Sequence, residues 1–276
     1  MLVAESGRRL DWAGASAQEE TTPTYPTREP VISVVVRTLN EEAGLPVLLD
    51  GLRAQRENRF EVVVVDSGST DRTREIALAR RDVPVRLVDL AEFTYGRALN
   101  VGVEAARGRF VAFLSAHVEI LSEDWLGEML RACSRPRVAA AFSRQVPWLY
   151  SPWYERFFVW WMYGRHLRVP ALPPFSFTNA ATMIRRDCWA SRRFDEALAA
   201  CEDYEWASRV LRSGYELVWV PGVAVRHSHE ESLRRFLGRR YREGRVLCRV
   251  IASHLTAPSD GDDGPTVAHE PAEASA

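Results

Sequence analysis

Runs of apolar, mostly β-branched residues recur along the first half of the chain and are separated by segments with helical periodicity. The runs cover residues 31–36, 61–65, 85–88 and 110–114. Continuous apolar runs of this length are typical of strands that are covered on both faces. The leucines of residues 45–52 instead recur at helical spacing, which predicts a helix between the first two strands. This alternation with short connections predicts an α/β fold, with a mostly parallel central sheet flanked by helices.

The second half of the chain has a less regular pattern. Residues 138–146 predict a further strand, and an aromatic segment at residues 148–163 follows it. A helix is predicted over residues 202–212, with Gly214 as its C-terminal stop. The remaining predicted elements are short strands over residues 215–220 and 223–226 and an Arg-rich helix over residues 231–250.

The chain is predicted to hold one folded domain. Its 276 residues, 46% of them hydrophobic, suffice for one sizeable core. We assign residues 30–255 to this domain. Residues 1–29 are polar and punctuated by prolines near their end, and residues 256–276 lack apolar periodicity. We therefore expect a flexible leader and a disordered tail on either side of the domain.

Composition excludes several classes of protein. The net charge of −1 gives no overall attraction for nucleic acid, so we expect no nucleic-acid partner. The four cysteines lie far apart without a C-x-x-C pair, which argues against a zinc knuckle or a disulfide framework and indicates reduced thiols in the cytoplasm. No apolar run approaches the roughly 20 residues that span a bilayer, and the N-terminus lacks a signal-peptide pattern. We expect a soluble or peripheral protein.

Residues 109–125 are the segment around which the chain is organised. The strand at residues 110–114 ends in Ser115, Ala116 and His117. In an open α/β sheet, ligands bind in the crevice at the carboxyl ends of the strands. We therefore expect these three residues to lie where the chemistry occurs.

Asp66 ends the second predicted strand and is followed by the turn-rich segment SGSTD. A carboxylate at that position can accept hydrogen bonds from a ribose hydroxyl or a base N–H, although the same residue types also favour a plain turn and helix cap. An NAD-dependent enzyme would need G-x-G-x-x-G after the first strand. The sequence there is instead RTLNEE, which argues against NAD.

Five segments, taken in order, resemble the inverting family 2 glycosyltransferases, which have a GT-A fold. They are VVRTLNEE, EVVVVDSGSTDRT, GRALNVGVEAARG, FVAFLSA and CEDYEWASRVLRSGYEL. The similarity extends over residues 32–240, and DSGSTD, YGRALN and HSH are most similar to the rhamnosyltransferase-like branch. The resemblance implies an enzyme that moves a sugar from a nucleotide-diphospho-sugar donor to an acceptor hydroxyl with inversion, and a role in making cell-envelope polysaccharide.

The resemblance also implies a nucleotide-sugar-binding half, residues 30–146, and an acceptor-binding half, residues 147–255. The family's donor contacts then fall on matching positions of the first half. These positions are Arg37, Thr38, Leu39, Glu41, Asp66, Arg97, Asn100, Ser115 and Ala116. Arg37 and Leu39 depart from the Pro and Tyr that are commoner in the family.

Glu202 and Asp203 match the family's Glu-Asp motif, in which the aspartate is the general base. An inverting transfer needs one carboxylate to take the proton of the acceptor hydroxyl during attack on the anomeric carbon. An acidic pair in the first turn of a helix is also favoured by the helix dipole alone. We predict that Asp203 is the general base, with Glu202 beside it as a second catalytic carboxylate.

The segment from Ser115 to His117 departs from the family's Asp-x-Asp, whose carboxylate holds Mg²⁺ or Mn²⁺ against the donor diphosphate. Hard divalent cations prefer oxygen ligands, and imidazole is acceptable to Mn²⁺ but poor for Mg²⁺. His229, in the later segment RHSH, is a second candidate ligand. We expect a divalent metal held by His117 and His229. The alternatives are Glu119 as a replacement carboxylate, or no metal and a diphosphate neutralised by arginines.

Two segments of the second half bear on the acceptor. The aromatic segment at residues 148–163 fits either a domain core or an interfacial helix whose Trp and Tyr side chains lie at headgroup level. The Arg-rich helix fits either a solvated surface or a face that binds acidic headgroups. Together they predict contact with a membrane surface and a glycan or lipid-linked acceptor, which would place a cytoplasmic protein at the inner face of the cell membrane.

A catalytically silent homologue that binds nucleotide-sugar and has lost its metal site is the main alternative. The change from Asp-x-Asp to Ser-Ala-His favours it. The retained Glu202-Asp203 pair argues against it, because a protein without a reaction has no use for a base. We therefore predict an active glycosyltransferase.

Overall fold

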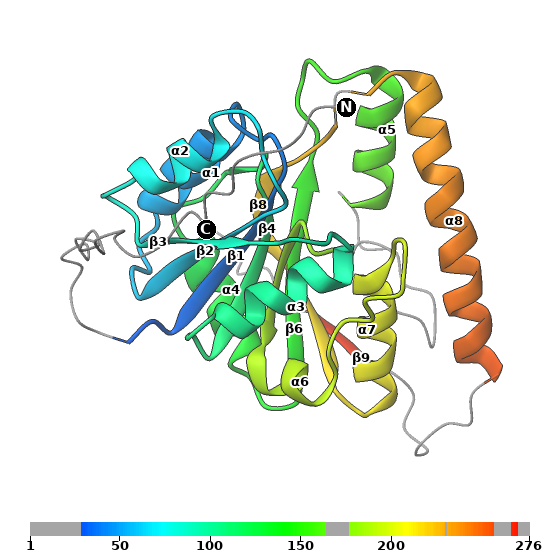
Figure 1. Ribbon diagram of the computed structural model, residues 1–276. Helices are drawn as coiled ribbons and strands as arrows, with labels where there is room; N and C mark the ends of the chain where they lie inside the picture. Colours follow the sequence, from blue (N-terminus) through cyan, green and yellow to red (C-terminus); the bar gives the residue numbers. More distant parts are fainter. Residues whose placement is uncertain (1–28, 164–176, 230, 257–265, 270–276) are drawn as a thin grey trace, which may run out of the picture.

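The computed structural model describes residues 29–163, 177–229, 231–256 and 266–269 (Figure 1). The predicted leader therefore lies outside the described residues, apart from Glu29. The predicted tail lies outside them as well, apart from Thr256 and residues 266–269.

A single mixed β-sheet forms the centre of the fold. Its strands run in the order β3-β2-β1-β4-β7-β6-β8-β5, and β9 pairs with β8. The strands are β1 (Ile32–Thr38), β2 (Phe60–Asp66), β3 (Val85–Asp89), β4 (Phe110–Ser115), β5 (Glu119–Ile120), β6 (Val138–Val146), β7 (Ala181–Arg185), β8 (Glu216–Arg226) and β9 (Thr266–His269). The predicted α/β class with a central sheet flanked by helices is confirmed.

The first four strands in the sheet order are parallel, and the sheet is mixed because β7 in its middle and β5 at its edge run antiparallel to their neighbours. Strand β7 pairs antiparallel with both β4 and β6. As a result β1, β4, β6 and β8 all point the same way, and their carboxyl ends share one edge of the sheet. Neither β7 nor the helix after it was predicted, because five residues of strand directly joined to a short helix show no clear period.

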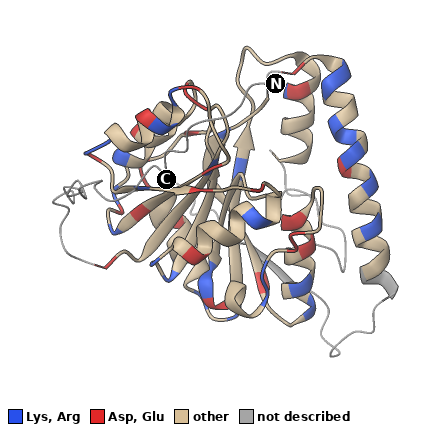
Figure 2. Ribbon diagram, in the orientation of Figure 1, with Lys and Arg blue, Asp and Glu red and all other residues tan. Residues whose placement is uncertain are grey.

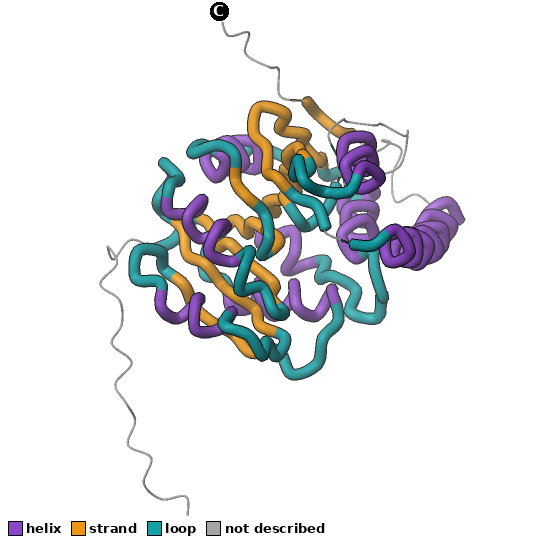
Figure 3. The backbone as a smooth tube through the Cα atoms, turned by 90° about the horizontal axis from the view of Figure 1, so that it is seen from above, coloured by secondary structure: helices purple, strands orange, loops and turns teal. Residues whose placement is uncertain are grey.

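Helices cover both faces of the sheet, as the view from above shows (Figure 3). The core on one face combines Val34 and Val36 of β1 with residues of α1, α2 and α4, and the core on the other face combines Val35 with residues of α3, α6 and α7. The helices are α1 (Leu45–Arg53), α2 (Thr73–Ala79), α3 (Tyr95–Ala105), α4 (Trp125–Cys133), α6 (Arg186–Ser191) and α7 (Glu202–Arg212). Because these strands are buried on both faces, their sequences are continuous apolar runs, and such runs predict strands.

Two further helices, α5 (Trp153–Met162) and α8 (Leu233–Thr256), lie side by side at the periphery of the fold (Figure 1). They contact each other through aromatic rings: the Phe236 ring centroid lies 5.2 Å from that of Tyr154 and 5.7 Å from that of Phe158. Among the described residues, no helix combines the length and the apolar character needed to cross a bilayer.

Two details of the last strands differ from the prediction. Residues 215–220 and 223–226 were predicted as separate strands, but they form the single strand β8, whose pairing with β6 is irregular between Ser143 and Arg144. Within the predicted tail, β9 pairs with residues 216–219 of β8. That stretch of the β8 edge is open because β5 covers only its far end, at Val225 and Arg226.

Candidate functional site

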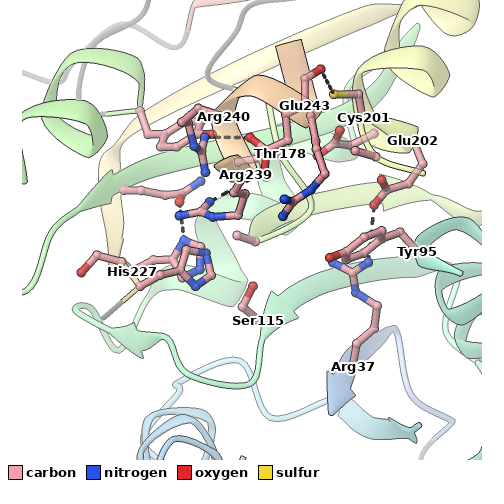
Figure 4. Close-up of a pocket in the computed structure, with 18 of the residues that line it drawn as sticks. Arg37, Tyr95, Ser115, Thr178, Cys201, Glu202, His227, Arg239, Arg240 and Glu243 are labelled. Atoms are coloured by element: carbon pink, nitrogen blue, oxygen red, sulfur yellow. Dashed lines mark hydrogen bonds and ion pairs between the residues drawn. The ribbon is translucent and has the colours of Figure 1, made fainter. Parts of the chain in front are cut away.

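A cavity of about 970 Å³ lies at the carboxyl ends of the parallel strands. Its walls come from segments that are far apart in the sequence: the ends of β1 and β4, the start of α7, the segment after β8, and helices α5 and α8 (Figure 4). Most of the predicted site residues line it. These are Arg37, Thr38, Leu39, Glu41, Ser115, Ala116, His117, Glu202, Asp203 and His229.

The start of α7 brings the acidic pair to the cavity wall. Cys201, just before the helix, has φ of 60°, a left-handed conformation that is uncommon for a residue other than glycine. This sharp turn directs Glu202 and Asp203 into the cavity. Asp203 accepts hydrogen bonds from the backbone N–H of Asn179 at 3.2 Å and of Tyr204 at 2.8 Å, so its carboxylate is held in place by rigid backbone.

Glu202 and Asp203 differ in their surroundings. Glu202 is 5% exposed, and its Oε1 lies 3.4 Å from Nη1 of Arg37. Burial raises the pKa of both carboxyl groups, and for Glu202 the neighbouring Asp203 charge raises it further while Arg37 lowers it. Hydrogen bonds from Tyr204 and Asn179 partly offset the rise for Asp203. Two adjacent carboxyl groups with raised pKa values, Glu202 buried and Asp203 partly buried, are a typical setting for acid–base chemistry.

The end of β1 is held against the ends of its two neighbouring strands. Thr38 lies opposite Asp66 of β2, and Arg37 lies opposite Ser115 of β4. The guanidinium of Arg37 also stands over the ring of Tyr95, 5.3 Å from its centroid (Figure 4). The register of the sheet thus places four of the predicted donor-binding positions next to one another.

Asp66 lies just behind the cavity wall rather than in it. Only 1% of it is exposed, and its carboxylate accepts hydrogen bonds from Thr38, Gly68, Ser69 and Arg74. Burial alone would raise the pKa of Asp66, but the hydrogen bonds from Ser69, Thr38 and Arg74 outweigh it, so the pKa is lowered. Asp66 is therefore an ionised acceptor that orders the loops after β1 and β2.

Arg97 and Asn100 do not line the cavity. Arg97 forms an ion pair with Glu92 on the surface. Asn100 is 1% exposed, and its side-chain amide forms four hydrogen bonds. The NH2 group donates to the Phe194 carbonyl and to Glu196, and the oxygen accepts from the Trp189 indole N–H and the Phe194 backbone N–H. In this structure Asn100 ties α3 to the segment before α7.

The end of β4 delivers Ser115, Ala116 and His117 to the cavity floor. Gly44 makes this possible, because a Cβ at that position would lie 2.7 Å from the His117 Cα and 3.0 Å from the Ala116 carbonyl oxygen. His117 accepts or donates at both ring nitrogens: Nδ1 lies 3.0 Å from Oε1 of Glu41, and Nε2 lies 3.2 Å from Nε2 of His227.

His227 is a cavity residue that the sequence analysis did not select. It follows β8 and is anchored by its backbone N–H to the Val146 carbonyl at 2.8 Å. With His117 and His229 it forms a cluster whose ligand atoms all lie within 4.8 Å of one another. The signal was available, because residues two apart on an extended segment point to the same side. His227 and His229 could have been taken as a pair.

The electrostatics of the cluster favour neutral imidazoles at His227 and His229. Burial lowers the pKa of His227 well below its usual value, and His117, His229 and Arg239 lower it further. Burial, Arg239 and His117 together lower the pKa of His229 to about 3. Neutral imidazole is the form that binds metal ions. Three nitrogen donors fit Mn²⁺ and other transition metals and suit Mg²⁺ poorly.

The opposite wall of the cavity comes from α5 and α8 and is rich in charge (Figures 2 and 4). Arg239 lies near three carboxylates: Nε is 2.9 Å from Glu231, and the guanidinium is 3.6 Å from Glu155 and 3.8 Å from Glu243. Arg240 pairs with Glu243 at 3.0 Å. Burial raises the pKa of Glu243 to about 7, despite the opposing effect of Arg239.

The sequence of the chain matches the profile of Glycosyl transferase family 2 over residues 33–189. That match covers β1 to α6, including the floor of the cavity. It ends before the acidic pair of α7.

Two curated relatives illustrate the similarity. The O-antigen chain rhamnosyltransferase RfbN of Salmonella typhimurium is 23% identical over 208 residues, which cover 72% of this chain and 66% of that protein. A PGL/p-HBAD biosynthesis glycosyltransferase of Mycobacterium bovis is 36% identical over 122 residues, which cover 43% of this chain and 44% of that protein. The matched segments thus span less than two thirds of each relative.

Solved structures share the fold. A mannosyltransferase from Pyrobaculum calidifontis, solved in complex with GDP-Man and Mn²⁺, superposes with a TM-score of 0.65 at 24% identity, over 86% of this chain and 66% of that one. TarS from S. aureus superposes with a TM-score of 0.60 at 20% identity, over 84% of this chain and 66% of that one. The predicted GT-A fold is confirmed.

Proposed function

The chain belongs to glycosyl transferase family 2, and we propose that it transfers a sugar from a nucleotide-diphospho-sugar donor to an acceptor hydroxyl with inversion at the anomeric carbon. The observation that carries this proposal is the carboxylate pair of buried Glu202 and partly buried Asp203, which faces the ends of β1 and β4 across the cavity. Carboxylates with raised pKa values at the carboxyl edge of an α/β sheet suit proton transfer beside a bound donor.

In the proposed reaction the acceptor oxygen bonds to the anomeric carbon as the bond from that carbon to the diphosphate oxygen breaks. Asp203 takes the proton of the acceptor hydroxyl, and the nucleoside diphosphate leaves with the electron pair. Asp203 suits this role because two backbone N–H groups fix it while Glu202 is paired with Arg37. Glu202 then acts by holding the Arg37 guanidinium and by setting the charge around Asp203.

The donor is proposed to lie over the ends of β1 and β4. Its nucleotide would contact residues 37–41, and its diphosphate would lie near Ser115 and Ala116, which line the cavity floor. Asp66 supports this region from behind by fixing Thr38 and Ser69. We do not assign donor contacts to Arg97 or Asn100, which lie away from the cavity.

A divalent metal is proposed to assist the transfer, as the Mn²⁺ in the structure of the Pyrobaculum calidifontis mannosyltransferase suggests. His117 and His229 would hold it, and their nitrogen donors suit Mn²⁺. When bound, such an ion would supply positive charge to the departing diphosphate.

The acceptor is proposed to be a glycan or a lipid-linked glycan of the cell envelope, reached at the inner face of the cell membrane. The names of the two curated relatives place them in O-antigen and in PGL/p-HBAD biosynthesis. The exposed surface beside the cavity supports this: α5 exposes Trp153, Phe157 and Trp160 by 50–75%. Exposed Trp next to arginines is typical of a surface that meets lipid headgroups.

A silent nucleotide-sugar-binding protein is the alternative function, favoured by the replacement of Asp-x-Asp with Ser115, Ala116 and His117. The two functions differ in product formation. A silent homologue binds a donor and releases no nucleoside diphosphate.

A donor screen tests the proposal. The full chain is heated with UDP-, dTDP- and GDP-sugars, with and without Mn²⁺, because a ligand that binds only the native state raises the melting temperature. Each donor that binds is then assayed for nucleoside diphosphate release, with EDTA as the control. We expect one donor class to bind and to be turned over. Binding without turnover supports the silent homologue, and failure of every nucleotide-sugar to bind overturns both.

A further inference from the structure

Three histidines from two strand ends converge on the cavity. His117 follows β4, and His227 and His229 follow β8, yet their ring centroids are 5.0–5.1 Å apart in each pair. Their ligand nitrogens all lie within 4.8 Å of one another. A convergence of this kind is set by the sheet, because Val146 of β6 anchors His227 and β1 anchors the strand before His117.

The ring orientations of His117 and His227 are fixed by oxygen acceptors. Nδ1 of His117 lies 3.0 Å from a carboxylate oxygen of Glu41, and Nδ1 of His227 lies 2.8 Å from the side-chain oxygen of Gln145. In a neutral imidazole only one nitrogen carries a proton. With both Nδ1 atoms donating to oxygen, both Nε2 atoms present lone pairs.

Those two lone pairs face each other. The Nε2 atoms are 3.2 Å apart, and two unprotonated nitrogens at that distance repel instead of forming a hydrogen bond. A shared cation removes the conflict. Two imidazole nitrogens bound to one ion at about 2.1 Å in tetrahedral or octahedral arrangement are about 3.0–3.4 Å apart, which matches the observed separation.

We propose that His117, His227 and His229 together bind one divalent transition-metal ion through three imidazole nitrogens, and that Glu41 and Gln145 are positioning residues for this site. A carboxylate or carbonyl partner on the far nitrogen of a metal-binding histidine fixes its tautomer and orientation. The site deepens the metal expectation of the proposed function. Binding of the ion itself does not depend on that function.

The donor set determines the choice of ion. Three nitrogen ligands select against Mg²⁺ and Ca²⁺, which prefer all-oxygen sites, and affinity should rise from Mn²⁺ through Co²⁺ and Ni²⁺. The cavity side of the cluster is open, since all three histidines line it. Oxygen ligands from water or a diphosphate can complete the coordination there. This site therefore differs in chemistry from the carboxylate site that the resemblance implied.

Charges around the cluster permit a cation. Glu41 contacts His117 directly, and Glu155 accepts a hydrogen bond from the backbone N–H of His229 at 3.2 Å. The guanidinium of Arg239 is close enough to lower the pKa values of His227 and His229, but it lies near Glu155, Glu231 and Glu243.

Cobalt provides the test because a bound Co²⁺ ion absorbs visible light. The full chain, stripped of metal with a chelator, is titrated with Co²⁺ without any nucleotide-sugar, and the visible d–d bands and calorimetric stoichiometry are recorded. We expect one Co²⁺ per chain, displaced by Zn²⁺ and by Mn²⁺ at higher concentration, and unaffected by a large excess of Mg²⁺. Absence of a stoichiometric Co²⁺ spectrum, or displacement by Mg²⁺, overturns the proposal.

Variants locate the site. His117→Ala, His227→Gln and His229→Ala should each weaken Co²⁺ binding at least about tenfold, and Glu41→Gln about 10–100-fold. The exposed thiol of Cys248 could also bind Co²⁺, so Cys248→Ser is the matched control and should leave affinity unchanged. Far-UV circular dichroism confirms that each variant is folded, and unchanged affinity in a folded His227→Gln rules out a three-histidine site.

The outcome separates the two proposals. Stoichiometric Co²⁺ with no turnover of any donor supports the metal site and rejects the transferase. Donor turnover that resists EDTA, in a protein that binds no Co²⁺, supports the transferase and rejects the metal site.

Discussion

Arg37 and Glu202 form an ion pair across the cavity, with 3.4 Å between Nη1 of the arginine and Oε1 of the glutamate. The two residues are 165 positions apart in the sequence. The pair joins the end of β1 to the first turn of α7 and occupies the Glu202 carboxylate. Asp203, held by two backbone N–H groups, is thereby the carboxylate left to accept a proton.

Asp203→Asn is expected to remove transfer while leaving donor binding intact. Loss of a general base typically lowers the rate about 10²–10⁴-fold. The amide has nearly the shape of the carboxylate, but its single oxygen can replace only one of the two acceptors that bind the N–H groups of Asn179 and Tyr204. Steady-state kinetics measures the rate, and the donor-induced rise in melting temperature measures binding.

Glu202→Gln is the comparison for that experiment. It should lower the rate less than Asp203→Asn, because Glu202 is proposed to act through Arg37 rather than on the acceptor. If Asp203→Asn retained turnover and Glu202→Gln abolished it, the base assignment would pass from Asp203 to Glu202.

Arg37→Met is expected to destabilise the protein in a pH-dependent way. Arg37 lowers the pKa of Glu202, whereas burial and Asp203 raise it. Without the guanidinium, the ionised form of Glu202 becomes costlier, and the protonated form at low pH is little affected. The free energy of unfolding should fall by about 1–3 kcal/mol at pH 8 and by less at pH 5.

Urea unfolding of four proteins measures this coupling: wild type, Arg37→Met, Glu202→Gln and the double variant. In the Glu202→Gln background the charge is gone, so Arg37→Met should cost less than it does in wild type. Equal costs in the two backgrounds at pH 8 would mean that the ion pair contributes nothing to stability.

The first half of the fold could be predicted from the sequence because its strands are buried on both faces. Val34, Val35 and Val36 are each at most 1% exposed, so nearly every position had to be apolar. The antiparallel strand β7 could not be predicted in this way. Its position between β4 and β6 follows from pairings with residues 40 to 75 positions away, which a local pattern does not record.

The site was predictable to the extent that its residues end strands or begin helices. His117 and Asp203 are of this kind, and both line the cavity. The role of His227 depends on facing His117, which is 110 positions away. Asn100 shows the converse: its segment resembles the family's, but its four hydrogen bonds to residues 189–196 become visible only in three dimensions.

Glu243 is expected to make stability fall as pH rises. Its pKa is raised to about 7 by burial, so the folded state holds a proton that the unfolded state, with a value near 4.5, releases. Between about pH 4.5 and pH 7 folding therefore becomes less favourable as pH increases. Because the side chain is 33% exposed, solvent screening limits the effect to about 1–2 kcal/mol.

Glu243→Gln removes that titration. Unfolding free energies of wild type and variant, measured at pH 5, 6, 7 and 8, should converge at the acid end, and the variant should lose less stability toward pH 8. Parallel curves over the whole range would show that Glu243 titrates normally in the folded protein.

Gly44→Ala is expected to displace His117. The added Cβ would lie 2.7 Å from the His117 Cα, so backbone must shift, and such overpacking costs about 1–3 kcal/mol. The variant should be less stable and should bind Co²⁺ more weakly.

Gly127→Ala in α4 is the matched control, because nothing lies within 4 Å of its Cβ position. It should be neutral or more stable by up to about 1 kcal/mol. Equal metal affinity in the two variants would mean that Gly44 does not govern the His117 position.

The exposed surface of α5 and α8 is expected to bind anionic membranes. Trp153 and Phe157 are 75% and 58% exposed, and arginines are distributed along α8 (Figure 2). Co-sedimentation with vesicles of anionic lipid should be strong at low salt and weaker at high salt, because salt screens the attraction between arginines and headgroups. Co-sedimentation with vesicles of zwitterionic lipid should be weak, because their headgroups carry no net negative charge. Trp153→Ser should reduce binding by severalfold. Leu78→Ser, which removes a 56% exposed apolar side chain from α2, should not. Equal binding of both variants would place lipid contact elsewhere, and failure of the wild type to bind anionic vesicles would point to a water-soluble acceptor.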